Sequence, residues 1–323
     1  MSSRQLILEA LREARGTVVS GEFLASRLGI SRAAVAKHIK ALRALGYEVS
    51  AFTGSGYSMS MAPDIPLPAE VAALVSEPLW VRFEGGASTG STNDDARKLA
   101  AKGCPSGTVV LASHQQKGRG RFGRNWESPE GGVYLSAVLR PQIALADLAP
   151  IALVISVGVA RGLRRLGADA KLKWPNDLVI GSRKVAGILV EVSAEVDQVE
   201  WIVAGVGVNV RPGSGRLEGA AYLSEAVGKQ DRLLLPAVAA AILDGVASAY
   251  IHFERDGFEA LRAEYESLST LTGEEVVVRD IAGAICSSGR ARGIDHTGRL
   301  LVEDYSGKKV ALSAGDVTLK GAR

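Results

Sequence analysis

The chain has 323 residues, of which 47 % are hydrophobic and 23 % charged, and its net charge is +3. That length allows two or three domains with buried cores, and the charge is too small to indicate a partner for the whole chain. Cys104 and Cys286 lie far apart, which excludes a disulfide framework and a zinc-ligand spacing, so we expect reduced thiols in a cytoplasmic protein. The N-terminus mixes charges into its apolar positions, so we do not expect a signal peptide there. The uncharged run near 148–160 is too short to cross a bilayer, and we expect no membrane association.

The first sixty residues are more basic than the rest and show a helix-turn-helix pattern. They hold eight Lys/Arg and four Asp/Glu, a net of +4. Apolar spacing predicts helices at 4–15 and 22–28, and Gly29 indicates a turn because glycine accepts a left-handed backbone. Ser31 then caps a second helix, which a short hairpin around Gly-Ser-Gly follows. These elements predict a winged helix-turn-helix over residues 1–62.

The helix that begins after Ser31 carries the cations that would contact DNA. A short cationic helix suits the major groove and its phosphates. Some winged helices bind only proteins, and the sequence leaves that alternative open. The candidate DNA-binding residues are Ser31, Arg32, Lys37, His38 and Lys40.

The remaining chain predicts two further domains after a linker. Three prolines within 62–70 indicate a stiff connection. Residues 70–270 alternate strand-like and helix-like segments, which is typical of an α/β or α+β domain of enzyme size. After 271–273 the pattern changes to five short strands, which suggest a small barrel. Expected strands lie at 81–85, 107–113, 132–139, 171–173, 177–180, 185–193 and 200–210, and expected helices at 93–102, 147–166, 232–250 and 255–267.

Residues 114–132, HQQKGRGRFGRNWESPEGG, carry cations between closely spaced glycines. GRGRFG matches the dinucleotide-binding fingerprint, but a proline, two glycines and a strand-like run follow it in place of the required helix. The chain has no P-loop pattern either. Guanidinium groups bind phosphate and carboxylate, and glycines let a loop close over a ligand. The loop therefore suits a carboxylate that attacks the α-phosphorus of a nucleoside triphosphate, and an exposed contact to a nucleic-acid backbone is the alternative.

Two further segments carry polar groups at the ends of expected elements. KWPND places Lys173, Asn176 and Asp177 at a strand start, and Lys184 opens the next strand. The Pro-Asn-Asp corner offers oxygens for Mg²⁺ or a ribose, although such a segment can be a simple β-turn. Ser-Thr-Asn at 91–93 precedes a helix, where it would bind a small polar head group or serve as an N-cap.

In this order, STN, GRGRFGRNWESPEGG, KWPND, RKVAGILVE and GVGVNV (205–210) resemble the biotin–protein ligase family. SRAAVAKHIKALRALGYEV resembles the DNA-binding part of its bifunctional members, the biotin operon repressors. The resemblance covers nearly the whole chain. It implies an α+β fold: a winged helix, a central domain similar to class II aminoacyl-tRNA synthetases at 70–270, and an SH3-like barrel at 271–323.

The resemblance also implies a reaction and its partners. Biotin and MgATP would give biotinyl-5′-AMP and pyrophosphate, and a lysine of a biotin carboxyl carrier domain would then take the biotinyl group. The chain would also be a biotin-responsive repressor that binds operator DNA as a homodimer, with the adenylate promoting dimerisation. We expect that dimer to form through the strand near 187–193, as an exposed sheet edge that the carrier protein can also use.

Site residues follow from the resemblance motif by motif. It implies catalytic roles for Lys184, Arg119 and Arg121. Mg²⁺ would reach Asp177 through MgATP. The biotin-binding set is Ser91, Thr92, Asn93, Gln115, Gly118, Arg119, Gly120, Arg121, Lys184 and Gly187, and the ATP-binding set is Arg121, Arg124, Trp126, Asn176, Asp177, Lys184 and Asn209.

Three positions depart from the family pattern. His114 stands where a tyrosine-like residue is expected, and Phe122 stands where relatives often carry another arginine. Lys320 replaces an arginine near the nucleotide, which keeps the charge but loses the guanidinium fork. Two competing functions remain, a ligand-sensing repressor with a vestigial ligase domain and a ligase for lipoate. The arginine loop and Lys184 argue against the first, and the loop and the N-terminal domain against the second.

Overall fold

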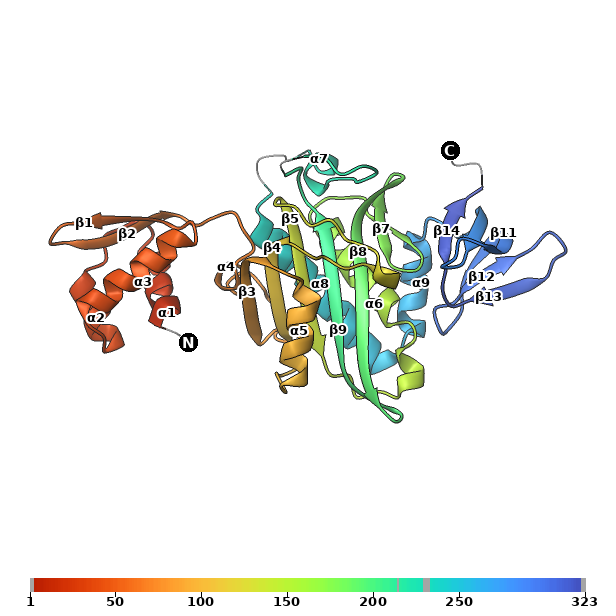
Figure 1. Ribbon diagram of the computed structural model, residues 1–323, viewed down its shortest axis with the longest axis horizontal. Coiled ribbons are helices and arrows are strands. Elements are labelled where there is room, and N and C mark those ends of the chain that lie inside the picture. Colours follow the sequence, from red (N-terminus) through yellow and green to blue (C-terminus); the bar gives the residue numbers. More distant parts are fainter. Residues whose placement is uncertain (1–2, 214, 229–232, 321–323) are drawn as a thin grey trace. The chain divides into compact units, whose positions relative to one another are not determined.

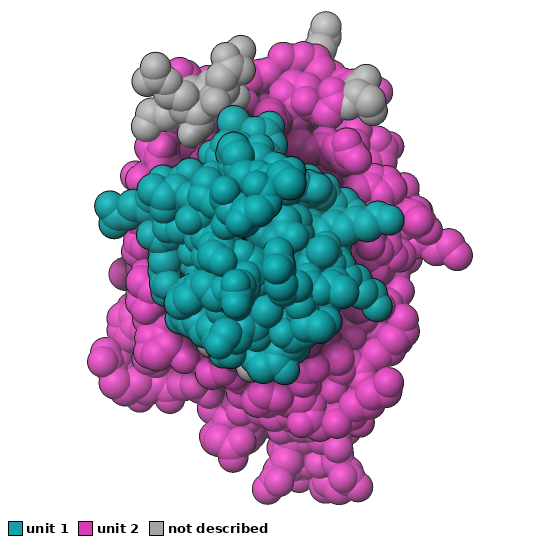
Figure 2. All heavy atoms as spheres, turned by 90° about the vertical axis from the view of Figure 1, so that its left-hand side faces the viewer, with its two compact units in different colours: residues 1–65 teal, residues 66–323 magenta. Residues whose placement is uncertain are grey.

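The computed structural model describes residues 3–213, 215–228 and 233–320. The first two and last three residues of the expected terminal domains, and the expected helix start at 232, lie outside the described residues. The chain divides into two compact units, residues 1–65 and 66–323, which Figure 2 shows in separate colours.

The first unit is the predicted helix-turn-helix with its hairpin. Gly29 ends the first helix of the motif in the left-handed region, at φ 62°, as its position predicts. The Ser31 hydroxyl accepts a hydrogen bond from the backbone N–H of Ala34, so it caps the next helix. Val35 and Ile39 from that helix are buried in a small core. The elements are α1 (Ser3–Glu13), α2 (Gly21–Leu28), α3 (Arg32–Ala44), β1 (Glu48–Phe52) and β2 (Gly56–Met61).

The second unit is built on a seven-stranded sheet in the order β3-β4-β5-β9-β8-β7-β6 (Figure 1). Only β3 and β4 run parallel, and every other neighbouring pair is antiparallel. All seven strands were expected, and the sequence placed β5, β6 and β7 at their observed bounds. The strands are β3 (Arg82–Thr89), β4 (Thr108–Gln115), β5 (Gly132–Leu139), β6 (Lys171–Lys173), β7 (Asp177–Ile180), β8 (Arg183–Glu195) and β9 (Gln198–Asn209).

Helices cover both faces of this sheet. On one face lie α6 (Ile151–Arg165), α8 (Leu235–Asp256) and α9 (Glu259–Leu268), and α5 (Thr92–Ala101) covers the other (Figure 1). Alternate strand residues face the two layers, because successive side chains of a strand point to opposite sides. Leu111 packs into the large core, and Val110 packs into the small core under α5. The apolar helix α8 has the length and hydropathy of a membrane span, but 72 % of that window is buried in the protein, as expected of a core helix.

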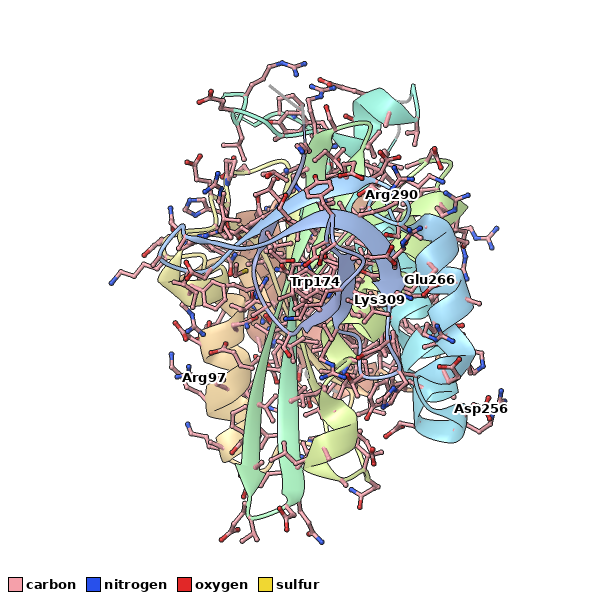
Figure 3. The ribbon with its side chains drawn as sticks, turned by 90° about the vertical axis from the view of Figure 1, so that its right-hand side faces the viewer. Arg97, Trp174, Asp256, Glu266, Arg290 and Lys309 are labelled. Carbon is pink, nitrogen blue, oxygen red and sulfur yellow. The ribbon has the colours of Figure 1, made fainter. Side chains whose placement is uncertain are left out.

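The C-terminal strands form a curled antiparallel sheet in the order β13-β12-β11-β10-β14 (Figure 3). Their buried side chains belong to the same core as the central sheet. The Trp174 indole N–H donates to the carbonyl of Gly298 at 3.0 Å, and Glu266 of α9 accepts from the backbone N–H of Ile294 at 3.3 Å. These contacts fix the sheet beside the end of the central domain. The strands are β10 (Glu275–Arg279), β11 (Ile285–Ile294), β12 (Leu300–Glu303), β13 (Lys309–Leu312) and β14 (Asp316–Leu319).

The structure differs from the sequence prediction in its short elements and at the ends of two long helices, since α8 continues to Asp256 beyond the expected end at 250. The expected linker 62–70 contains the start of α4 (Pro68–Ala72), whose Pro68 occupies a first-turn position that needs no N–H donor. The expected helix 147–166 begins only at Ile151, after a 3₁₀ turn. A further short helix, α7 (Leu223–Ala226), was not predicted. Both cysteines are free thiols, as expected.

Candidate active site

A cavity opens above the middle of the sheet, on the face that carries α5. Its floor is made by glycines, because Gly187 of β8 pairs with Gly207 of β9, and Gly205 lies one step further along. A Cβ on Gly207 would lie 2.4 Å from the Trp126 indole nitrogen, and one on Gly205 would lie 2.0 Å from Asn93 Oδ1. The glycines therefore make room for Trp126 and Asn93 to lie directly against the sheet.

The N-terminus of α5 supplies a polar end to the cavity. Gln115 Oε1 accepts from the Thr92 backbone N–H at 2.8 Å and from its hydroxyl at 3.1 Å. The Ser136 hydroxyl donates to Asn93 Oδ1 at 2.6 Å. Ser91 occupies the N-cap position of α5 but makes no capping hydrogen bond, and its buried hydroxyl has no partner. The simple N-cap interpretation of this motif is therefore wrong for the Ser91 side chain, which is available to a ligand.

The expected flexible loop is folded as a hairpin of residues 115–128, called here the arginine hairpin. Isolated bridges join Gln115 to Ser128 and Arg119 to Asn125. Its tip is a 3₁₀ turn, Arg121–Gly123, in which Phe122 has a positive φ of 56°. No helix follows it in the fully described segment 124–131, which confirms that GRGRFG is not a dinucleotide-binding fingerprint.

The three arginines of the arginine hairpin have different partners. Arg119 forms ion pairs with Glu191 at 2.6 Å and with Asp94 at 3.0 Å. Arg124 forms an ion pair with Asp316. Arg121 donates instead to the neutral Asn176 side chain, Nη1 to Oδ1, at 3.1 Å.

Arg121 is the arginine best prepared to receive an anion. Burial has the largest effect on the pKa of Arg121 and lowers it. The positive charge of Arg124 also lowers this pKa, whereas the negative charges of Asp316 and Asp177 raise it. A guanidinium that has lost part of its hydration and has no ion-pair partner gains most from a bound carboxylate or phosphate.

Lys184 reaches into the same cavity from β8. Its Nζ lies 2.6 Å from Asp177 Oδ1 and 4.9 Å from the centroid of the Trp126 ring. Asn209 Nδ2 donates to the Lys184 carbonyl at 3.3 Å, which holds this part of the strand. The arrangement places an ammonium group beside Arg121, Asn176 and Asp177 around one opening.

The structure brings most of the predicted residues together. The exceptions are Gly118, which lies under Trp126 and Ser128 outside the cavity, and Asn209, which borders a neighbouring hollow. Lys320 does not reach the cavity and donates to the Tyr305 hydroxyl at 2.8 Å. Those that line the cavity are Ser91, Thr92, Asn93, Gln115, Arg119, Gly120, Arg121, Arg124, Trp126, Asn176, Asp177, Lys184 and Gly187.

Sequence reasoning missed several residues of the site. Asp316 comes from the C-terminal sheet, and Glu191 and Asp94 hold Arg119. The alternating glycines of GVGVNV, at 205 and 207, were the one available signal for the cavity floor. Apolar lining comes from Leu189, which pairs with Gly205, whereas the side chains of Ile188 and Val206 point away into the large core.

Three buried donors at the cavity have no hydrogen-bond partner in the described protein: the Ser91 hydroxyl, Arg119 Nε and the Trp126 indole N–H. Buried polar groups are nearly always paired, so an unpaired set around one cavity indicates a ligand that accepts hydrogen bonds. Among the described residues there is no cluster of three or more His, Cys, Asp and Glu that could hold a metal ion.

Comparison with known proteins places this site in a family. The profile of the biotin/lipoate A/B protein ligase family matches residues 85–209, an HTH domain profile matches 3–58, and the biotin protein ligase C-terminal domain matches 271–320. The bifunctional ligase/repressor BirA of Bacillus subtilis is 34 % identical over 320 residues, which cover 96 % of this chain and 97 % of the relative.

The chain belongs to the biotin protein ligase family. BirA of Escherichia coli is 35 % identical over 322 residues, with 96 % of this chain and 95 % of the relative covered. The biotin protein ligase of Aquifex aeolicus, solved in complex with biotin and ATP, superposes with a TM-score of 0.63 at 28 % identity, over 75 % of this chain and 99 % of that one. The predicted family and three-part fold are thereby confirmed.

Proposed function

We propose that this biotin protein ligase family member activates biotin with MgATP to biotinyl-5′-AMP and transfers biotin to a lysine of a biotin carboxyl carrier domain, and that the cavity above β8 and β9 is where this occurs. The observation that carries the proposal is the set of unpaired donors at a glycine floor, facing Arg121 and Lys184. A cavity of this kind suits an apolar ring system with a few polar atoms and an anionic tail.

Biotin would lie with its ureido group at the N-terminus of α5. The Ser91 hydroxyl is unpaired there, and Leu189, which pairs with Gly205 on the cavity face, supplies apolar surface for the fused rings. Its carboxylate would extend toward Lys184 and Arg121, on the side where Asn176 and Asp177 border the cavity. The nucleotide would occupy that second side.

In the first step, a carboxylate oxygen of biotin attacks the α-phosphorus, and the bond to pyrophosphate breaks. Lys184 and Arg121 would offset the repulsion between the two anions and stabilise the charge that develops on phosphorus. Asp177 offers an oxygen to Mg²⁺ that arrives with ATP, which is the ligand type that Mg²⁺ prefers. In the second step, the neutral amine of the carrier lysine attacks the biotinyl carbonyl, AMP leaves, and the amide nitrogen loses its proton.

Transfer of labelled biotin tests this function. With MgATP, the protein should label a carrier domain on its biotin-accepting lysine, and a carrier in which that lysine is arginine should stay unlabelled. Equal labelling of the two carriers would show that the site does not direct transfer, and no labelling of either would contradict ligase activity.

The N-terminal unit would bind DNA through α3, as a repressor does. The Ser31 hydroxyl accepts the capping hydrogen bond of α3. Ser31 is nevertheless exposed at the start of this helix, where DNA could still contact it. Arg32, Lys37 and Lys40 are exposed on α3, whereas Val35 and Ile39 are buried. His38 is half-buried on the same helix. This split leaves the cations on the outer face, where they can reach phosphates.

Lys40→Gln is expected to weaken binding to a random-sequence DNA duplex and to reduce the slope of log affinity against log salt by roughly 0.9, because one phosphate contact is lost. Titration by fluorescence anisotropy at several salt concentrations measures this slope. Arg4→Gln, an equal loss of charge on α1, should leave the slope unchanged. Equal slopes for wild type and Lys40→Gln would contradict the assignment of Lys40.

A homodimer would form through part of β8. The prediction that the strand near 187–193 is an edge of the sheet is wrong for β8 as a whole, because β8 lies between β9 and β7. The pairing with β7, however, covers only Arg183–Gly187, so among the described residues the strand from 189 onward pairs with β9 alone. Val192 is 44 % exposed on this half, which offers a free edge to a second copy.

Biotinyl-AMP is expected to shift the protein from monomer to dimer in sedimentation velocity, and Val192→Lys to keep it monomeric, because a charge then meets its copy across the two-fold axis. Leu74→Lys, which charges another exposed apolar position, should dimerise like wild type. If wild type sediments as a monomer both with and without biotinyl-AMP, the dimer proposal is contradicted. The cytoplasmic location stays a prediction.

A further inference from the structure

Glu191 is a meeting point of three elements beside the cavity. Its Oε2 accepts from Asn93 Nδ2 at 2.8 Å and from Arg119 Nη2 at 2.6 Å. Its Oε1 accepts from Arg97 Nη1 at 3.1 Å. Burial raises the pKa of Glu191, but the hydrogen bonds from Asn93, Arg119 and Arg97 outweigh it and leave the pKa below the usual value. The carboxylate is therefore charged at neutral pH and joins β8, α5 and the arginine hairpin.

The partners of Arg119 argue against a role as the cation that receives the reacting anions. Two carboxylates, Glu191 and Asp94, already neutralise its guanidinium. A bound anion would have to displace them or remain unpaired with Arg119. The Arg121 guanidinium instead donates its hydrogen bond to the neutral Asn176 side chain. The side chain of Arg119 is therefore placed to connect the arginine hairpin to the sheet and to α5.

The position of Arg119 in the arginine hairpin indicates what its ion pair with Glu191 holds in place. Arg119 lies between the two glycines of GRG, and the Trp126 backbone N–H donates to the Gly118 carbonyl at 3.0 Å on the facing strand of the hairpin. Arg121 and Trp126 line the cavity and belong to the arginine hairpin. The ion pairs of Arg119 hold this hairpin against the rest of the domain. Release of Arg119 from Glu191 would let this segment move off the cavity.

We propose that Glu191 is a positioning residue that holds the arginine hairpin over the cavity through Arg119, and so retains the acyl-adenylate until an acceptor lysine arrives. This inference rests on the proposed ligase function. Glu191 touches no reacting atom, and its effect passes through Arg119.

Retention of the intermediate tests the proposal. Wild type and Glu191→Gln are loaded with labelled biotin and MgATP, freed of small molecules, and followed for loss of bound biotinyl-AMP. The glutamine keeps an acceptor for Asn93 but loses the ion pair with Arg119, so release should be about tenfold faster, as for a hydrogen bond to a charged group. Glu191→Asp, which keeps the charge, should restore part of the retention.

Arg97→Gln is the matched control, because it removes the other arginine from Glu191 without touching Arg119. It should retain the intermediate as wild type does. Salt adds a second readout: the ion pair is partly exposed, so salt should speed release from wild type more than from Glu191→Gln, in which Arg119 keeps only its ion pair with Asp94.

The outcomes separate the two levels of the account. Equal retention of biotinyl-AMP by wild type and Glu191→Gln would overturn the positioning role. Release from Arg97→Gln as fast as from Glu191→Gln would also overturn it, because both variants would then act through a general loosening of α5 and β8. A wild type that forms no biotinyl-AMP would overturn the proposed function and the positioning role with it.

Discussion

Lys184→Met is expected to slow biotinyl-AMP formation about 10²–10³-fold, which corresponds to roughly 2.7–4 kcal/mol of transition-state stabilisation. Methionine keeps most of the side-chain volume and removes the ammonium group that lies 2.6 Å from Asp177. The attacking carboxylate and the α-phosphate would then meet with one fixed cation fewer, and Asp177 would add an uncompensated negative charge. The rate is measured in single turnover, as labelled biotin converted to biotinyl-AMP.

Lys117→Met controls for loss of a positive charge on the arginine hairpin itself. Lys117 is exposed and does not line the cavity, so its rate should stay close to that of wild type. Thermal unfolding of both variants checks that the fold is intact. A folded Lys184→Met protein with the wild-type rate would contradict the assignment of Lys184.

Arg121→Gly is expected to release bound biotinyl-AMP roughly 10- to 100-fold faster than wild type, because charge-assisted hydrogen bonds contribute about 1.5–3 kcal/mol. Arg121 is the arginine of the hairpin that has no carboxylate partner, and Asn176 is held independently by the Ile188 carbonyl at 2.7 Å. Its removal should therefore affect the ligand more than the protein. Loss of the labelled intermediate after removal of free biotin and ATP measures the effect.

Arg124→Gly is the comparison for Arg121→Gly, since the Arg124 guanidinium is already paired with Asp316 of the C-terminal sheet. It should release the intermediate less quickly than Arg121→Gly. If Arg121→Gly retains biotinyl-AMP as long as wild type does, Arg121 does not hold the intermediate.

The sequence predicted short elements where turn residues bound them, since Pro175 and Asn176 separate β6 from β7 and Gly181 follows β7. β6, β7 and the α2–α3 turn at Gly29 follow from local patterns and a single conformational requirement. The short helices α4 and α7 have five and four residues, too few for a helical period to show. Their presence depends on tertiary packing, which no local window contains.

The candidate site divides in the same way. Residues in the glycine-arginine, KWPND and STN motifs were found because each motif is local. Glu191, Asp94 and Asp316 were missed because their significance lies in which arginine each one meets, and Asp316 meets Arg124 across 192 positions of chain. The role of β8 was only partly predicted. The four-residue length of β7 leaves half of β8 paired with β9 alone among the described residues, and this follows from sheet register.

Biotin-dependent exchange of labelled pyrophosphate into ATP, with lipoate as the control acid, tests the central claim most directly. The account predicts exchange with biotin and none with lipoate, because the unpaired Ser91 hydroxyl at the N-terminus of α5 would be satisfied by a ureido group that lipoate lacks. Exchange with lipoate and none with biotin would contradict the proposal that biotin is the substrate. No exchange with either acid would contradict adenylation at this site.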